Sequence, residues 1–87
     1  MGYQVTEFEP TPNPNAVKAI LDQPICDETR SYFNAGQAVD DPIATSLFAI
    51  PGVLGVMLLG DFVTVSKTPD ADWQTIKAKV RKVLAEA

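Results

Sequence analysis

Residues 53–66 read VLGVMLLGDFVTVS, a pattern that predicts a β-hairpin. Two β-rich runs flank Gly60-Asp61, and glycine tolerates the positive φ angle that a tight turn between two strands requires. The first run is apolar on both alternating sets of positions, so we expect an internal strand that is at least partly covered on both faces. The second run alternates valine with threonine or serine, which predicts one dry face and one wetter face.

The segment before this hairpin, DPIATSLFAIPG at residues 41–52, predicts a short helix. Asp41 is a suitable N-cap, and Pro42 stands at the first helical position, where its missing N–H is not needed. Pro51-Gly52 is expected to end the helix. Its apolar residues recur at steps of four and three, which gives one buried stripe: Ile43, Leu47 and Ile50.

The segment after the hairpin, TPDADWQTIKAKVRKVLAEA at residues 68–87, predicts a longer helix that packs on the sheet. Thr68 or Asp70 is expected to cap it, with Pro69 inside its start. The run from Lys77 to Lys82 is interpreted as a solvated face, with a docking surface for an acidic partner as the alternative. The apolar stripe, in which Trp73 is expected to be a core residue, comprises Trp73, Ile76, Val80, Val83, Leu84 and Ala87.

Three further strands are predicted in the first part of the chain: YQVTEF at 3–8, AVKAIL at 16–21 and TRSYF at 29–33. Phe8 lies on the opposite parity from the other apolar residues of its strand, which suggests a bulge or an approaching strand end. Residues 16–21 would also suit a short capped helix, but the turn-forming residues on both sides favour a strand.

Together these elements predict an α+β fold in the order ββ(β)αββα. We expect a mainly antiparallel sheet of four to five strands with two helices on one face. No repeat or linker divides the sequence, so residues 1–87 are predicted to form a single domain.

The segment TPNPN at residues 11–15 contains no pattern of a helix or strand. Residues that precede a proline are pushed towards extended geometry, so residues 9–14 are predicted to form an extended strip with unpaired carbonyl groups. Asn13 and Asn15 could hydrogen-bond to the local backbone. Two interpretations remain open: a rigid connection between two strands, or a recognition edge that carries Thr11, Asn13, Asn15 and Lys18.

Composition limits the function classes. The net charge of −4 disfavours a nucleic-acid partner, since phosphate binding requires a basic surface. No apolar run approaches the roughly 20 residues that span a bilayer, so no membrane partner is expected. The first residues lack the features of a signal peptide. The single cysteine, Cys26, allows no intrachain disulfide and fits a reducing compartment, so we predict a cytoplasmic location.

The sequence offers few groups for catalysis. It contains no histidine, the commonest general base and metal ligand. Cys26 is followed by Asp27 and Glu28 rather than by the basic groups that activate a thiolate, and we interpret it as a small, partly buried apolar residue. We therefore expect no enzymatic activity, no cofactor and no metal site.

Several motifs, taken in order, resemble the N-terminal domain of the Nfu/NifU-type iron–sulfur scaffold proteins. They are TPNPN with a lysine three residues later, DPIATSLFAIPGV, GDFVTVSK and DADW, and the resemblance runs from Thr11 to about Leu84. In that family a second domain with a Cys-x-x-Cys motif binds the cluster, and this sequence has no such motif. The resemblance implies partner docking through Thr11, Pro12, Asn13, Pro14, Asn15 and Lys18, with Asp61 and Lys67 as additions.

The leading hypothesis is therefore a non-catalytic interaction module in iron–sulfur cluster assembly or delivery. It would dock a scaffold, carrier or client protein through the TPNPN segment. One alternative is direct metal or cluster binding through Cys26 in an oligomer. Another is a small α+β ligand-binding or regulatory domain unrelated to iron. The apolar strand at residues 53–59 is compatible with either a monomer or a weak homodimer.

Overall fold

The hairpin predicted at residues 53–66 forms the middle of the sheet. In a computed structural model that describes residues 2–87, β4 (Val53–Leu59) and β5 (Phe62–Lys67) pair in antiparallel fashion, with Leu59 opposite Phe62. Gly60 adopts a φ of +57° in the connecting turn, as the sequence predicts. β5 is the central strand of the sheet.

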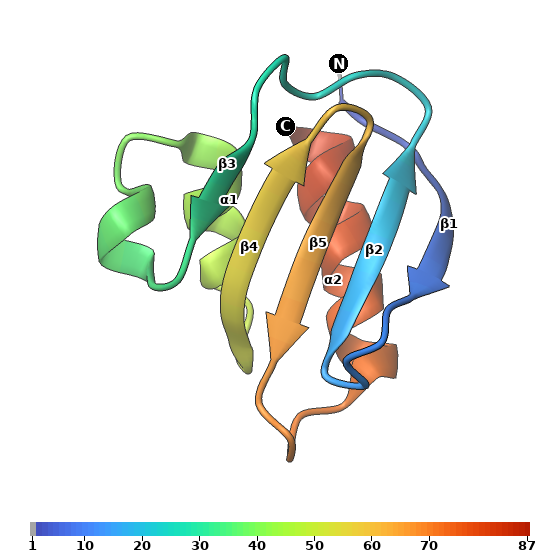
Figure 1. The fold of residues 1–87 in the computed structure, drawn as a ribbon, viewed down its shortest axis with the longest axis vertical. Helices are drawn as coiled ribbons and strands as arrows, with labels where there is room; N and C mark the ends of the chain where they lie inside the picture. The colour runs from blue at the N-terminus through green and yellow to red at the C-terminus, as the bar shows by residue number, and fades with distance from the viewer. Residues whose placement is uncertain (1) are drawn as a thin grey trace.

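The remaining elements complete a five-stranded antiparallel sheet with the strand order β1-β2-β5-β4-β3. Both α-helices lie behind the sheet in Figure 1, so the predicted α+β architecture is confirmed. The other bounds are β1 (Val5–Pro10), β2 (Ala16–Leu21), β3 (Arg30–Tyr32), the 3-10 helix η1 (Ala35–Ala38), α1 (Pro42–Phe48) and α2 (Trp73–Glu86). The sequence did not predict η1.

The first strand is displaced from its predicted position at residues 3–8. Tyr3 does not join the sheet, because its N–H donates to the carbonyl oxygen of Leu84 at the end of α2, 2.7 Å away. The pairing register shifts between Val5 and Glu7, so the parity of Phe8 reflects an irregularity within the strand rather than an approaching strand end, the other explanation offered. The strand then continues through Pro10, which a strand at the edge of a sheet can accommodate.

Both helices start at aspartate N-caps, but one start and one end differ from prediction. The Asp41 carboxylate accepts the N–H of Ala44 as expected, whereas α1 ends at Phe48 rather than near Pro51-Gly52. α2 begins at Trp73 with Asp72 as its cap, so the prediction of Thr68 or Asp70 was wrong. The N–H of Ala71 donates to the carbonyl of Thr68, and this turn takes up the residues that were assigned to the helix.

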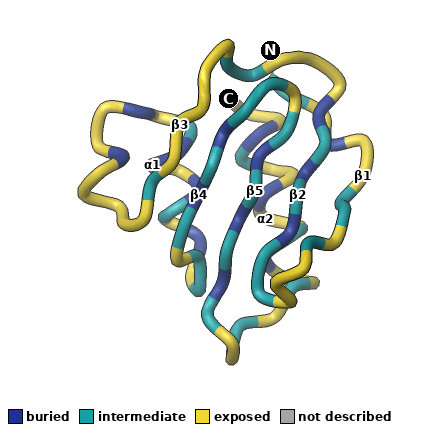
Figure 2. The backbone as a smooth tube through the Cα atoms, viewed as in Figure 1, coloured by how far each residue is buried: buried dark blue, intermediate teal, exposed yellow. Residues whose placement is uncertain are grey.

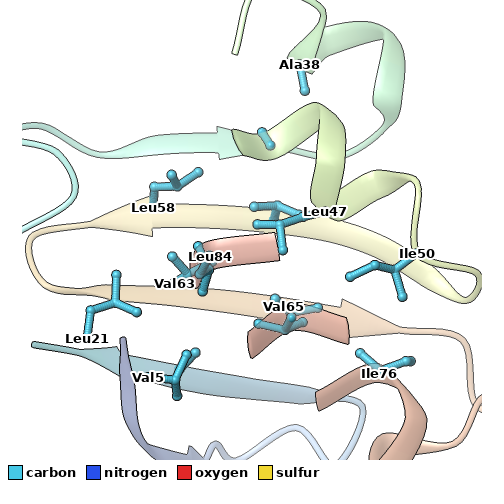
Figure 3. Packing of buried hydrophobic residues seen from close by; sticks show 14 residues of the cluster. Val5, Leu21, Ala38, Leu47, Ile50, Leu58, Val63, Val65, Ile76 and Leu84 are labelled. Atoms are coloured by element: carbon cyan, nitrogen blue, oxygen red, sulfur yellow. The ribbon is translucent and has the colours of Figure 1, made fainter. Parts of the chain in front are cut away.

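The core lies between the sheet and the two helices, as Figures 2 and 3 show. Along α2, Trp73 is only half-buried and Ala87 is exposed. The buried apolar stripe of this helix is therefore narrower than predicted. The second face of β4 is half-buried although no helix covers it. The largest fully buried side chains are Leu47, Val56, Leu58, Val63, Val65, Ile76, Val80 and Leu84.

Asp41 connects β3 to α1. The residue is buried, with 6% of its surface exposed, and its carboxylate accepts a hydrogen bond from the Tyr32 hydroxyl at 3.1 Å. An Arg30 guanidinium nitrogen lies 3.7 Å from the same carboxylate. Partial burial, together with the hydrogen bond to Asp41 and the charge of that carboxylate, raises the pKa of Tyr32.

We predict that Asp41→Ala lowers the free energy of unfolding by roughly 1–2 kcal/mol, because the helix loses its N-cap. Asp41→Asn should lose much less, since asparagine caps helices about as well as aspartate. Urea denaturation of both variants measures the difference. Equal stability of the two variants would show that capping is not the main contribution of Asp41.

Candidate partner-binding surface

The TPNPN segment forms the turn of a β-hairpin rather than an extended strip. Pro10 is paired with Val17 across β1 and β2, and residues 11–15 close the loop between them. The expectation of extended geometry through residue 14 was therefore wrong. Only Glu9 and Pro10 of the predicted strip belong to a strand.

Side-chain oxygens hold the turn in place. The Thr11 hydroxyl accepts the N–H of Asn13 at 3.1 Å and lies 2.9 Å from the Asn13 carbonyl oxygen, to which it can donate. The Asn13 side-chain oxygen accepts the N–H of Asn15 at 2.9 Å. Asparagine and threonine commonly stabilise turns in this way. The predicted local hydrogen bonding of Asn13 is thus confirmed.

Residues remote in the sequence anchor the same turn. The indole N–H of Trp73 donates to the Pro14 carbonyl at 3.0 Å, and the backbone N–H of Lys67 donates to the Asn15 carbonyl at 2.8 Å. The Asn13 carbonyl accepts the N–H of Ala16 at 3.0 Å. The prediction of unpaired carbonyls in residues 9–14 was therefore wrong at Asn13 and Pro14, and the turn is joined to both β5 and α2.

Lys67 is buried beneath this turn, with 7% of its surface exposed. Its ammonium group donates to the Asn15 side-chain oxygen and to the Thr68 carbonyl, each at 3.1 Å. It also lies 5.5 Å from the centre of the Trp73 ring, a favourable cation–π distance. Lys67 therefore supports the turn from inside the protein.

The structure brings together only part of the predicted surface. Residues 12–14 are exposed at the tip of the turn, and the half-buried Thr11 and Asn15 flank them. Lys18 alternates with the buried residues of β2, so it lies on the sheet face opposite the core, with its ammonium group 4.3 Å from the centre of the Phe62 ring. Asp61 lies in the β4–β5 turn at the opposite end of the sheet (Figure 1).

Sequence reasoning missed the contribution of Trp73 to this surface. Its helical spacing with Ile76 and Val80 indicated a core residue, yet its indole N–H reaches the turn. A signal was available, since a buried or half-buried tryptophan N–H usually requires a hydrogen-bond acceptor. That acceptor, the Pro14 carbonyl, lies 59 positions away in the chain, beyond the range of local patterns.

The side chains that could bind a metal ion are dispersed over residues 2–87. Within residues 2–87, no three histidine, cysteine, aspartate or glutamate side chains are grouped to hold a metal ion. Cys26 is half-buried and packs against the core, as the sequence suggested. Over the same residues, no helix has the length and apolar character needed to cross a membrane.

Comparison with known proteins identifies the family of this fold. The family model described as "Scaffold protein Nfu/NifU N terminal" matches residues 5–87. The chain belongs to this family. The resemblance derived from the TPNPN, GDFVTVSK and DADW motifs is thereby confirmed.

Curated relatives are considerably longer than this chain. It is 33% identical over 81 residues to "NifU-like protein 5, mitochondrial" of Arabidopsis thaliana. It is 35% identical over 82 residues to "NFU1 iron-sulfur cluster scaffold homolog, mitochondrial" of Drosophila erecta. Each match covers 92% of this chain but only 30% and 29% of the respective relative. The chain thus spans about 30% of the length of these relatives.

Solved structures share the architecture. The crystal structure of protein SAV1430 from Staphylococcus aureus has a TM-score of 0.75 and 27% identity, over 92% of this chain and 96% of that one. The solution structure of a NifU-like protein from Saccharomyces cerevisiae has a TM-score of 0.78 over 95% of this chain and 77% of that one. At 24% identity, this second likeness concerns the fold alone.

We predict that Asn15→Ala lowers the free energy of unfolding by roughly 1–3 kcal/mol, because the buried Lys67 ammonium loses an acceptor. Adding Lys67→Met should recover part of this loss, since the double variant no longer buries an under-satisfied charge. Urea denaturation of the two single variants and the double variant measures the coupling. Strictly additive effects would contradict the proposed support of the turn by Lys67.

We also predict an acid-sensitive start of α2. The Thr75 hydroxyl and N–H donate to the Asp72 carboxylate and hold its pKa below the ordinary value of 3.8. A carboxylate whose pKa is lowered in the folded state stabilises the protein at pH values above its ordinary, unfolded-state pKa. This contribution is lost as the pH falls through the lowered pKa. Asp72→Asn keeps an acceptor oxygen but does not titrate.

The urea midpoint of the Asp72→Asn variant should therefore fall less steeply below about pH 4 than that of the wild-type protein. A series of urea denaturations between about pH 6 and about pH 2 provides the comparison. If the urea midpoints of the two proteins fall equally steeply with decreasing pH, Asp72 does not contribute to the loss of stability in acid.

Proposed function

We propose that this Nfu/NifU N-terminal domain is a non-catalytic docking module in iron–sulfur cluster assembly or delivery. It contacts a scaffold, carrier or client protein through the exposed tip of the TPNPN turn, residues 12–14. The family supports the setting, because a relative 35% identical to this chain is named as an iron–sulfur cluster scaffold homolog.

The observation that carries the proposal is the prearranged geometry of the turn. Side chains within it and the groups of Lys67 and Trp73 beneath it fix its shape while residues 12–14 remain exposed. A surface that is rigid before binding loses little conformational entropy when a partner arrives. Prolines at positions 12 and 14 reduce that loss further.

The side chains of this domain are poorly suited to catalysis. The sequence contains no histidine to act as a general base near neutral pH. Cys26 is half-buried among core residues, which suits packing rather than nucleophilic attack or cluster ligation.

Affinity capture from an extract of the source cells tests the proposal, with the bound proteins identified by mass spectrometry. Asn13→Asp keeps the oxygen that accepts the Asn15 N–H, so the turn should persist, but it replaces the exposed amide group by a charge. We expect this variant to lose roughly tenfold in captured iron–sulfur assembly or client protein, a typical effect at a binding hot spot.

The matched control is Glu28→Gln, a single-charge change at an exposed position of the loop after β2, which contacts the β4–β5 turn at the opposite end of the sheet. It should capture as much partner protein as the wild type. The proposal fails if Asn13→Asp captures partners at the wild-type level, or if the recovered proteins have no connection with iron–sulfur clusters.

A further inference from the structure

A shallow groove lies beside the TPNPN turn, at the seam between the β1–β2 hairpin and α2. Its volume is about 190 Å³, and Phe8, Pro10, Pro14, Trp73 and Lys77 are among the residues that line it. Pockets for whole small ligands usually measure about 300–1,000 Å³. The groove therefore suits a single apolar side chain of a larger partner better than a free metabolite. No carboxylate lines it.

Cationic groups border this apolar floor along α2. Trp73, Lys77 and Arg81 follow one another at four-residue steps, so they share one face of the helix. The Lys77 ammonium lies 5.4 Å and the Arg81 guanidinium 5.0 Å from the centre of the Phe8 ring on β1. One guanidinium nitrogen of Arg81 also donates to the Val5 carbonyl, which leaves other N–H groups available.

In the part of the chain that the structure describes, neither cation forms an ion pair within 4 Å, although Asp22 lines a neighbouring pocket together with Arg81. Among residues 2–87, the ion pair within 4 Å joins Arg30 to Asp41, at the opposite edge of the sheet from β1. The whole protein has a net charge of −4, yet residues 77–82 contain four basic and no acidic residues. The seam is thus a local positive site on an acidic domain.

We propose that this groove binds an acidic peptide segment of the partner protein, with one aromatic or aliphatic side chain as its anchor. The anchor packs on Phe8, Pro10 and Trp73, while carboxylates on either side of it pair with Lys77 and Arg81. Complementary charge across an interface selects partners and fixes their register. The inference rests on the proposed docking role and names the chemistry of the partner.

A displayed library of random peptides of about twelve residues tests this inference with the wild-type chain as bait, since an extended segment of that length exceeds the groove. Selected peptides are fluorescein-labelled, and their dissociation constants are measured by fluorescence anisotropy. We expect an excess of aspartate and glutamate around an aromatic or aliphatic residue. Binding should weaken as salt is raised.

Lys77→Ala/Arg81→Ala should weaken binding of these peptides about tenfold or more, as expected for central interface cations. The matched control is Lys79→Ala/Lys82→Ala, which removes the same charge from exposed positions of the same helix. It should change affinity less than about threefold, the scale of rim charges.

The inference is overturned if no peptides are enriched, if enriched peptides lack acidic residues, or if both double variants lose affinity equally. Sedimentation that shows a wild-type dimer dissociated by Lys77→Ala/Arg81→Ala would also overturn it, because a second copy would then occupy the groove. Asn13→Asp separates the two proposals. Suppose that this variant captures partners from extract at the wild-type level while acidic peptides still require Lys77 and Arg81. The proposal for the groove is then supported, and the proposal for the TPNPN turn is rejected.

Discussion

Lys67 places its ammonium group on the helix side of the sheet, where few water molecules can reach it. A buried charge is tolerated only when hydrogen-bond acceptors replace the lost water. Here the Asn15 side chain and the Thr68 carbonyl are those acceptors, and the face of Trp73 adds a favourable contact. The β1–β2 turn therefore cannot move away from the end of β5 without exposing an unsatisfied ammonium group. The same constraint fixes the start of α2, whose Trp73 is bonded to Pro14.

This arrangement has a direct consequence for the surface. The turn, the central strand and the first residues of α2 form one connected unit, although they lie far apart in the sequence. The exposed tip of the turn and the groove next to Trp73 are therefore held in a constant relative position. A partner that contacts both meets a surface that does not need to be ordered first. The fold thus converts a proline-rich loop, which alone would be poorly defined, into a surface suited to recognition.

The sequence predicted those features that local chemistry determines. The glycine turn of the β4–β5 hairpin and the Asp41-Pro42 start of α1 follow from rules that act within a few residues. The shape of the TPNPN segment could not be predicted in this way, because Trp73 and Lys67 determine it from 59 and 52 positions away. Nor could the burial of Lys67 be foreseen, since alternation along β5 cannot show that Asn15 would receive its ammonium group. The cytoplasmic location, the monomeric or weakly dimeric state and the docking of an iron–sulfur assembly or client protein stay predictions from the sequence.

The distribution of charge suggests how a partner would be selected. A net charge of −4 repels an acidic segment at long range, where only the total charge is felt. Close to the surface the attraction reverses along the seam between the β1–β2 hairpin and α2. Lys77 and Arg81 are held there over Phe8, and within residues 2–87 neither forms an ion pair within 4 Å. An acidic segment would therefore gain little in association rate but much in orientation, since the seam attracts it while the net charge of the domain repels it. For a docking module that must present its partner in a single register, this distribution of charge favours specific binding over rapid association.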